Sequence, residues 1–193
     1  MKGDYIMETK KTSSREKLIK LVIAAMFAAL ICVMTMVVEI RVGSDGFINL
    51  GDGFILIAAW VLGPVYGFAA AGIGSAFADL FSGYMHYVPG TFVIKGLIAL
   101  AAALIAHAFI KKSEKLRIPG YIASGIVGEA IMVGGYYLYY SLLLGRGWAA
   151  AFMKVPGNVA QGVAGIVLGV VISTVIAQTK LLKLVHYNYS YAM

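Results

Sequence analysis

The stretch that decides the fold runs from residue 47 to residue 96 and reads FINLGDGFILIAAWVLGPVYGFAAAGIGSAFADLFSGYMHYVPGTFVIKG. Most of it is apolar or small, but the pair Gly63-Pro64 interrupts it. Because this pair breaks helices, the run is predicted not to form one straight helix. Small residues then recur at helical spacing and form one helix face: Gly67, Ala71, Gly74, Ser75 and Ala78. In a membrane, such a face lets helix backbones approach each other closely.

The composition of the whole chain points to a membrane protein. Of its 193 residues, 61% are hydrophobic and 13% are charged, whereas a soluble domain carries about 25% charged residues. The net charge is +7, but the basic residues flank apolar runs, so nucleic acid is not an expected partner. Cys32 is the only cysteine, which excludes a disulfide or a thiolate metal site within one chain.

The apolar runs predict an all-α integral membrane protein with a six-helix domain at 18–180. The six spans are expected at about 18–38, 51–63, 65–81, 92–109, 118–144 and 148–178. A basic tail at 1–17 and a second tail at 181–193 flank this domain. The first span is expected to be retained, because no small-residue cleavage site closes it. The short span at 51–63 is expected to tilt or to lie partly below the membrane surface.

The distribution of positive charge predicts the orientation. Twelve of the sixteen Lys and Arg residues lie in 1–20, 111–117 and the C-terminal tail. Since cytoplasmic segments are enriched in these residues, both termini are predicted to be cytoplasmic and the number of spans to be even. The alternative is a five-span layout that fuses 51–63 with 65–81, which would place 111–117 outside.

The sequence lacks the catalytic motifs that would indicate an enzyme. It contains no His-Glu-x-x-His, no Gly-x-Ser-x-Gly and no phosphate-binding Gly-x-x-x-x-Gly-Lys-Ser/Thr. His86 and His107 are too far apart to suggest a metal site. We therefore expect no enzymatic activity, no metal and no cofactor.

Polar side chains inside the apolar runs are the remaining functional signal. Lys95 is a candidate for a binding pocket, with a lysine that snorkels to the surface as the alternative. Glu129 needs a partner, which Lys95 or a ligand amine could supply, and a structural ion pair is the alternative. Asn158 and Gln161 share a helix face and suit the edge of a heterocycle, unless they only join helices.

Other polar and aromatic residues can be explained by a structural role as well as by a functional one. Asp52 is expected to cap a helix and Asp79 to be structural. Tyr87 and Tyr136 are candidates for stacking on a flat ligand, with an interfacial aromatic belt as the alternative.

Two pairs of alanines occupy the first span. Ala24 and Ala28 form one small-xxx-small pair, and Ala25 and Ala29 form another. Such pairs serve internal helix packing or intermolecular docking, and both readings stay open.

Five short blocks carry a resemblance to a known family. They are Ile48-Asn49-Leu50-Gly51-Asp52, Gly63-Pro64-x-x-Gly67, Gly74-Ser75-x-x-x-Asp79, Gly83-Tyr84-x-x-Tyr87-x-Pro89 and Lys95-Gly96. In these blocks and in layout over about 20–180, the chain resembles the substrate-binding S components of energy-coupling factor (ECF) transporters. The similar branch contains the riboflavin and the hydroxymethylpyrimidine/pyridoxine members. The absence of a tryptophan cluster in the pocket region argues against the thiamine-binding members.

The resemblance implies six helices and a vitamin pocket near the outer face, capped by the loop between the first two helices. It also implies a transmembrane coupling subunit and two cytoplasmic ATPases as partners, with the alanine face of the first helix as the docking surface. In the family, ligand contacts come from the first loop and from helices four to six. Together with the residue arguments above, this gives the candidate ligand-binding set Asn49, Tyr87, Lys95, Glu129, Tyr136, Asn158 and Gln161.

The expected function follows from the resemblance. The chain would be the substrate-capture subunit of an ATP-driven importer in the bacterial plasma membrane, which it would cross several times. Its substrate would be a small aromatic vitamin or precursor, with pyridoxine or hydroxymethylpyrimidine first and riboflavin or pantothenate next. The alternative is a stand-alone secondary carrier or channel, although the sequence shows no convincing inverted repeat.

Overall fold

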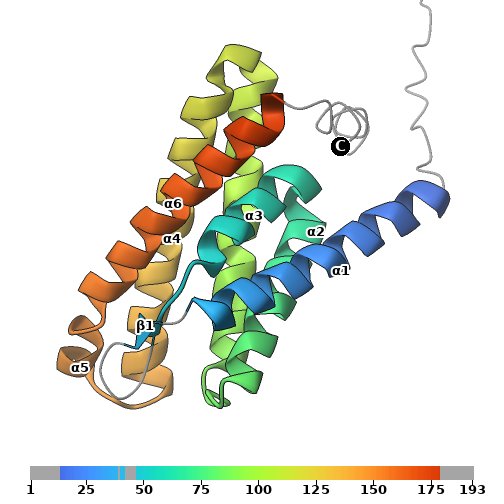
Figure 1. Ribbon diagram of the computed structural model, residues 1–193. Helices are drawn as coiled ribbons and strands as arrows, with labels where there is room; N and C mark the ends of the chain where they lie inside the picture. Colours follow the sequence, from blue (N-terminus) through green and yellow to red (C-terminus); the bar gives the residue numbers. More distant parts are fainter. Residues whose placement is uncertain (1–13, 39, 42–46, 179–193) are drawn as a thin grey trace, which may run out of the picture.

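The computed structural model describes residues 14–38, 40–41 and 47–178. It is a bundle of long helices, with one pair of two-residue strands (Figure 1). The helices are α1 (Ser14–Val37), α2 (Gly51–Phe81), α3 (Val88–Lys112), α4 (Arg117–Leu138), α5 (Trp148–Phe152) and α6 (Val155–Gln178). The shorter elements are β1 (Ile40–Arg41), β2 (Phe47–Ile48), the 3₁₀ turn η1 (Glu114–Leu116) and the π-helical turn η2 (Tyr139–Leu143). Most of the predicted tails and of the loop at 39–50 lies outside the described residues.

The expectation of an all-helical membrane fold is confirmed within this part of the chain. Five helical segments are long and apolar enough to cross a membrane: Ser14–Val37, Gly51–Phe81, Val88–Lys112, Glu114–Leu143 and Trp148–Ile176. On α6, exposed valines recur at every fourth position, at Val159, Val163, Val167, Val171 and Val175. An unbroken apolar ridge of this kind suits contact with lipid chains.

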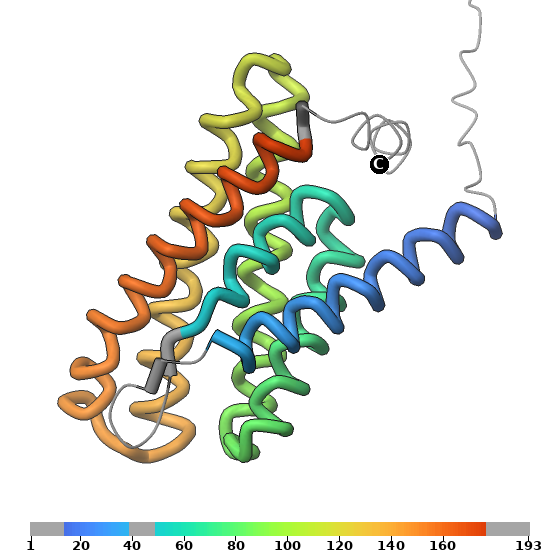
Figure 2. The backbone as a smooth tube through the Cα atoms, in the orientation of Figure 1, coloured from blue at the N-terminus to red at the C-terminus, as the bar shows by residue number. Residues whose placement is uncertain are grey.

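The segment Gly51–Phe81 counts once among these five, yet it is sharply bent. Gly63 has φ 77° and ψ −175°, a left-handed conformation that only glycine adopts readily. A Cβ placed on Gly67 would lie 3.1 Å from the Ala59 Cα, whereas a straight helix separates positions 59 and 67 by about 12 Å. The chain therefore folds back on itself at Gly63-Pro64, as Figure 2 shows. The predicted break is confirmed, and the six-span layout stays a prediction that this reversal supports.

Small residues allow α1, α2 and α3 to pack with their backbones close together. A Cβ on Gly74 of α2 would lie 2.4 Å from the carbonyl oxygen of Ala28 on α1. A Cβ on Gly72 would lie 2.8 Å from the carbonyl oxygen of Phe92 on α3. Both distances are shorter than atomic contact permits, so the small-residue pattern after Gly63 is explained by close helix packing.

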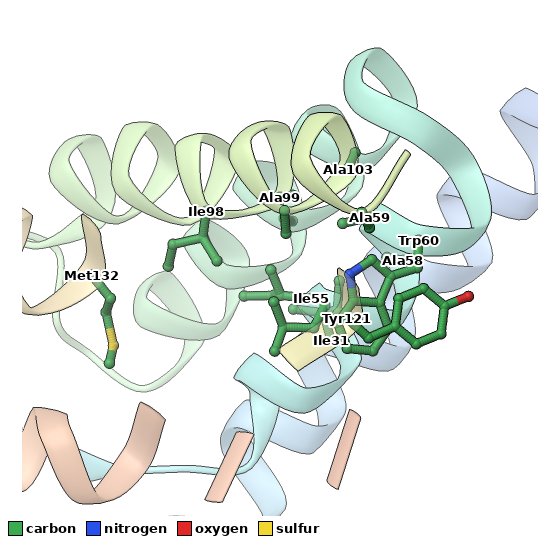
Figure 3. Packing of buried hydrophobic residues seen from close by; sticks show 14 of the residues in the cluster. Ile31, Ile55, Ala58, Ala59, Trp60, Ile98, Ala99, Ala103, Tyr121 and Met132 are labelled. Carbon is green, nitrogen blue, oxygen red and sulfur yellow. The ribbon is translucent and has the colours of Figure 1, made fainter. Parts of the chain in front are cut away.

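The hydrophobic core lies where α2 meets α3 and α4 (Figure 3). Ile55, Leu56, Ile98 and Met132 are fully buried there, with Ile31 of α1 beside them.

The core also contains an aromatic pair. The rings of Trp60 and Tyr121 stack with centroids 4.1 Å apart, and Trp60 Nε1 donates a hydrogen bond to Ser124 Oγ at 3.0 Å. The indole N–H is thus paired, as a buried polar group requires.

Segments far apart in the sequence meet at the two ends of the bundle. The strand pair, the 82–87 loop and α5 lie at the lower end in Figure 1. The bend within α2, the connection between α3 and α4, and the end of α6 lie toward the opposite end. The prediction from the charge distribution is that these two ends lie on opposite sides of the membrane.

Candidate functional site

A cavity of about 90 Å³ opens among the helices at the end that carries the strand pair. Its lining residues come from every long helix and from the segment after β2: Thr35, Asn49, Ser75, Asp79, Tyr84, Tyr87, Thr91, Lys95, Tyr136, Tyr137, Tyr140, Ala151, Lys154, Gly157, Asn158 and Gln161. Six of the seven sequence-predicted ligand contacts are in this wall, and Glu129 is not.

A buried ion pair stands behind the polar wall of the cavity, and of its two members Lys95 lines the cavity. Lys95 Nζ of α3 donates to Asp52 Oδ1 of α2, and the two side chains are 6% and 0% exposed. The snorkelling alternative for Lys95 is therefore wrong. The helix-cap prediction for Asp52 is also wrong, because the cap position of α2 is Leu50 and carries no side-chain hydrogen bond.

Gln161 of α6 joins this ion pair to the segment that enters α2. Its Nε2 donates to Asp52 Oδ2 at 2.5 Å, and its Oε1 accepts from the Asn49 backbone N–H at 3.0 Å. Asn49 Oδ1 in turn accepts from the Gly51 N–H at 2.8 Å. The interhelical role that was the alternative for Gln161 is thus present, and its side chain also faces the cavity.

Glu129 occupies a different place from the one expected. It is 5% exposed, and neither carboxyl oxygen has a hydrogen-bond partner among the described residues. It packs against α6, where a Cβ on Gly162 would lie 2.9 Å from the Glu129 Cβ. Of the two partners considered for Glu129, Lys95 instead pairs with Asp52, and the ligand amine stays a prediction.

Tyrosines form the apolar side of the cavity. Tyr87 is buried, with ring centroids 6.3 Å from Tyr136 and 6.4 Å from Tyr140. Lys154 Nζ lies 4.6 Å from the centroid of the Tyr140 ring. These rings face one another inside the bundle, so an aromatic belt at the lipid surface does not explain Tyr87 and Tyr140.

Several lining residues were not singled out from the sequence. The polar ones are Thr35, Ser75, Asp79, Thr91 and Lys154. Asp79 was expected to be structural, yet it is in the wall beside Ser75, one helical turn earlier. The signal in the sequence was the pair Ser75-x-x-x-Asp79, which places two polar groups on the small-residue face of α2.

The structure separates the two alanine pairs of α1. Ala24 is buried, and the backbone of Ala28 lies against Gly74. Ala25 and Ala29 are exposed. Ala24 and the backbone of Ala28 therefore pack inside the bundle, whereas Ala25 and Ala29 lie on its surface. Docking of another protein on α1 stays a prediction.

No group of His, Cys, Asp or Glu that could hold a metal ion occurs in the described part of the chain. Its features are membrane-length helices around a cavity with an aromatic wall and a polar wall, which define a membrane-embedded protein that binds a small molecule.

Comparison with known families supports a membrane-embedded protein that binds a small molecule, and it identifies the family. Residues 15–178 match the family described as "ECF-type riboflavin transporter, S component". The chain belongs to this family, which confirms the resemblance inferred from the motifs. It is therefore a component of a membrane transporter.

Individual relatives support the assignment. The chain is 36% identical to a Pyrococcus woesei protein described as "Uncharacterized protein in gap 3'region", over 72% of this chain and 88% of that one. It is 26% identical to the thiamine precursor transporter HmpT of Lactococcus lactis subsp. cremoris, over 90% and 96% of the two chains. A solved structure titled "Structure and mechanism of the S component of a bacterial ECF transporter" shares the fold. That match has a TM-score of 0.62 at 22% identity and covers 83% of this chain and 96% of that one.

Proposed function

We propose that this protein captures a small aromatic vitamin or vitamin precursor for an ECF-type importer, with pyridoxine or hydroxymethylpyrimidine as the preferred substrates. The observation that carries the proposal is that buried polar groups and tyrosine rings line the same cavity. Binding sites for small molecules combine an apolar, aromatic lining with a few placed polar groups in this way.

The aromatic wall of the cavity and one relative favour a single-ring substrate. Pantothenate has no ring to stack on Tyr87 or Tyr136. The relative HmpT, a thiamine precursor transporter, also favours a pyrimidine over a flavin.

Uptake would need energy from other subunits. The sequence has no phosphate-binding loop, so ATP hydrolysis would fall to two cytoplasmic ATPases acting through a transmembrane coupling subunit. The exposed Ala25 and Ala29 on α1 give that subunit a surface of small side chains for close helix packing. We place the complex in the bacterial plasma membrane.

Calorimetry on the purified protein tests the substrate, with pyridoxine, hydroxymethylpyrimidine, riboflavin and pantothenate as ligands. We expect one of the two single-ring compounds to bind most tightly. Tighter binding of riboflavin would contradict the preference for a single ring.

Uptake in cells that lack the ATPase subunits tests the mode of transport. We expect no uptake without them. Uptake that persists without the ATPases would instead favour the stand-alone carrier.

A further inference from the structure

The cavity wall holds two buried polar atoms that need a hydrogen-bond partner. They are Ser75 Oγ and Asp79 Oδ2, both on α2, and neither has a hydrogen-bond partner among the described residues. Ser75 is 1% exposed and Asp79 is 6% exposed, yet both line the cavity. Buried polar groups are normally paired, so two unpaired atoms one helical turn apart in a cavity wall need an explanation.

Two other hydroxyl groups of the same wall bond each other. Thr91 of α3 and Tyr136 of α4 line the cavity together with Ser75 and Asp79, and the Thr91 and Tyr136 hydroxyl oxygens lie 2.9 Å apart. Neither of the Asp79 Oδ2 and Ser75 Oγ atoms takes part in this bond.

The cations of the cavity wall are engaged elsewhere. Lys95 is paired with Asp52, and Lys154 lies over the ring of Tyr140. No ion pair of Asp79 with a described residue occurs. Since an unpaired buried carboxylate is costly, a ligand that donates hydrogen bonds to it would recover part of that cost.

We propose that Ser75 and Asp79 recognise a hydrogen-bond donor on the ligand, namely an amino group on a six-membered aromatic ring. The proposal rests on the proposed function and specifies its substrate class. The amino N–H groups donate to Asp79 Oδ2 and Ser75 Oγ, while the tyrosine rings contact the ring face. A carbonyl in place of the amino group would set its lone pairs against the carboxylate and be rejected.

The test compares two pyrimidines that differ at one position. Calorimetry would measure 4-amino-5-hydroxymethyl-2-methylpyrimidine and its 4-oxo counterpart on the full chain in detergent. We expect the wild type to bind the amino compound at least about tenfold more tightly. Asp79→Asn should abolish or invert this preference, because the asparagine amide can donate to the oxo group. Ser75→Ala should reduce it several-fold.

Controls separate recognition from folding. Ser124→Ala removes a buried serine that bonds Trp60 and does not line the cavity, so the amino/oxo ratio should not change. Each variant must elute as one species and melt as cooperatively as the wild type. If Asp79→Asn does not fold, the ratio of the affinities for the amino and oxo compounds in Ser75→Ala tests the inference instead.

The outcomes distinguish this inference from the proposed function. If the wild type binds a single-ring ligand and the variants keep the wild-type ratio, this inference is wrong and the proposed function stands. If the wild type prefers the oxo compound, the inference is also wrong. If no pyrimidine or pyridine binds the wild type, both are overturned.

Discussion

At the scale of single residues, Lys95 shows how far the sequence leads. A lysine in an apolar run predicts a functional site and a buried partner. Its partner could not be predicted, because Asp52 and Glu129 are both acidic residues in apolar sequence and distant from Lys95 along the chain. Only the packing of α2 against α3 decides for Asp52. The sequence thus predicts that Lys95 is buried and functional, but it does not predict which acidic residue pairs with it.

The first prediction concerns the ion pair. Asp52→Asn leaves the Lys95 ammonium buried without its counter-charge, which should cost about 3–5 kcal/mol of unfolding free energy. Lys95→Met should cost a similar amount by leaving Asp52 unpaired. The double variant should be more stable than either single variant, as thermal unfolding in detergent would measure. The exposed pair of Glu114 with Arg117 gives the control, because Glu114→Gln should melt close to the wild type. Equal melting temperatures for Asp52→Asn and the wild type would contradict a buried charge pair.

The second prediction concerns Asn158, which lines the cavity without being part of the ion-pair network. Asn158→Ala should weaken binding of the preferred single-ring ligand about tenfold or more, since a polar partner is lost. The melting temperature of the free protein should stay near that of the wild type. Val159→Ala changes an exposed neighbour on α6 and should leave the affinity unchanged. A similar Kd for all three proteins in calorimetry would mean that Asn158 does not contact the ligand.

At the scale of elements, the sequence predicts breaks and faces better than register. The break at Gly63-Pro64 and the small-residue face after it were both predictable, because each depends on local backbone chemistry. The two alanine pairs of α1 could not be told apart, since both have the same spacing. Contact with Gly74 places Ala28 inside and leaves Ala29 outside. Which face of a helix is buried depends on the helix that packs against it, and the sequence of one helix does not contain that information.

The third prediction tests the close packing of α1 on α2. Gly74→Ala would place a Cβ 2.4 Å from the Ala28 carbonyl oxygen, so the helices must separate at a cost of about 1–3 kcal/mol. The matched control is Gly134→Ala, where a Cβ would meet nothing within 4 Å. That variant should be as stable as the wild type or slightly more stable, because alanine is the better helix former. Thermal unfolding of the two variants side by side measures the difference, and equal melting temperatures would contradict the close approach.

The fourth prediction concerns the outer face of α1. Ala29→Trp should block vitamin uptake in cells that hold the complete transporter, while the Kd of the isolated protein stays at the wild-type value. The bulky ring would prevent a coupling subunit from approaching this face. Ala24→Trp is the contrasting variant, because Ala24 is buried and overpacking should lower the melting temperature. Normal uptake by Ala29→Trp would show that this face does not dock a partner.

At the scale of the whole molecule, charge and shape give two separate reasons for the same arrangement. The basic segment 111–117 covers the end of α3, η1 and the start of α4. It lies toward the end of the bundle that also holds the bend within α2. The cavity opens at the other end, near the strand pair and α5. With the basic end in the cytoplasm, the cavity would face outward and meet its substrate there. A five-span layout would reverse this relation for the segment 111–117.

The fifth prediction tests that orientation by labelling single cysteines in intact cells. In a Cys32→Ala background, Ser113→Cys lies between α3 and η1, at the basic end. It should resist a membrane-impermeant thiol reagent until the cells are opened. Met85→Cys replaces a residue that is 65% exposed in the loop at the opposite end, and it should react without opening the cells. Each cysteine variant is the control for the other, since both are labelled with the same reagent in the same Cys32→Ala background. Labelling of Ser113→Cys in intact cells would put the basic segment outside and turn the cavity toward the cytoplasm, where it could not capture a vitamin for import.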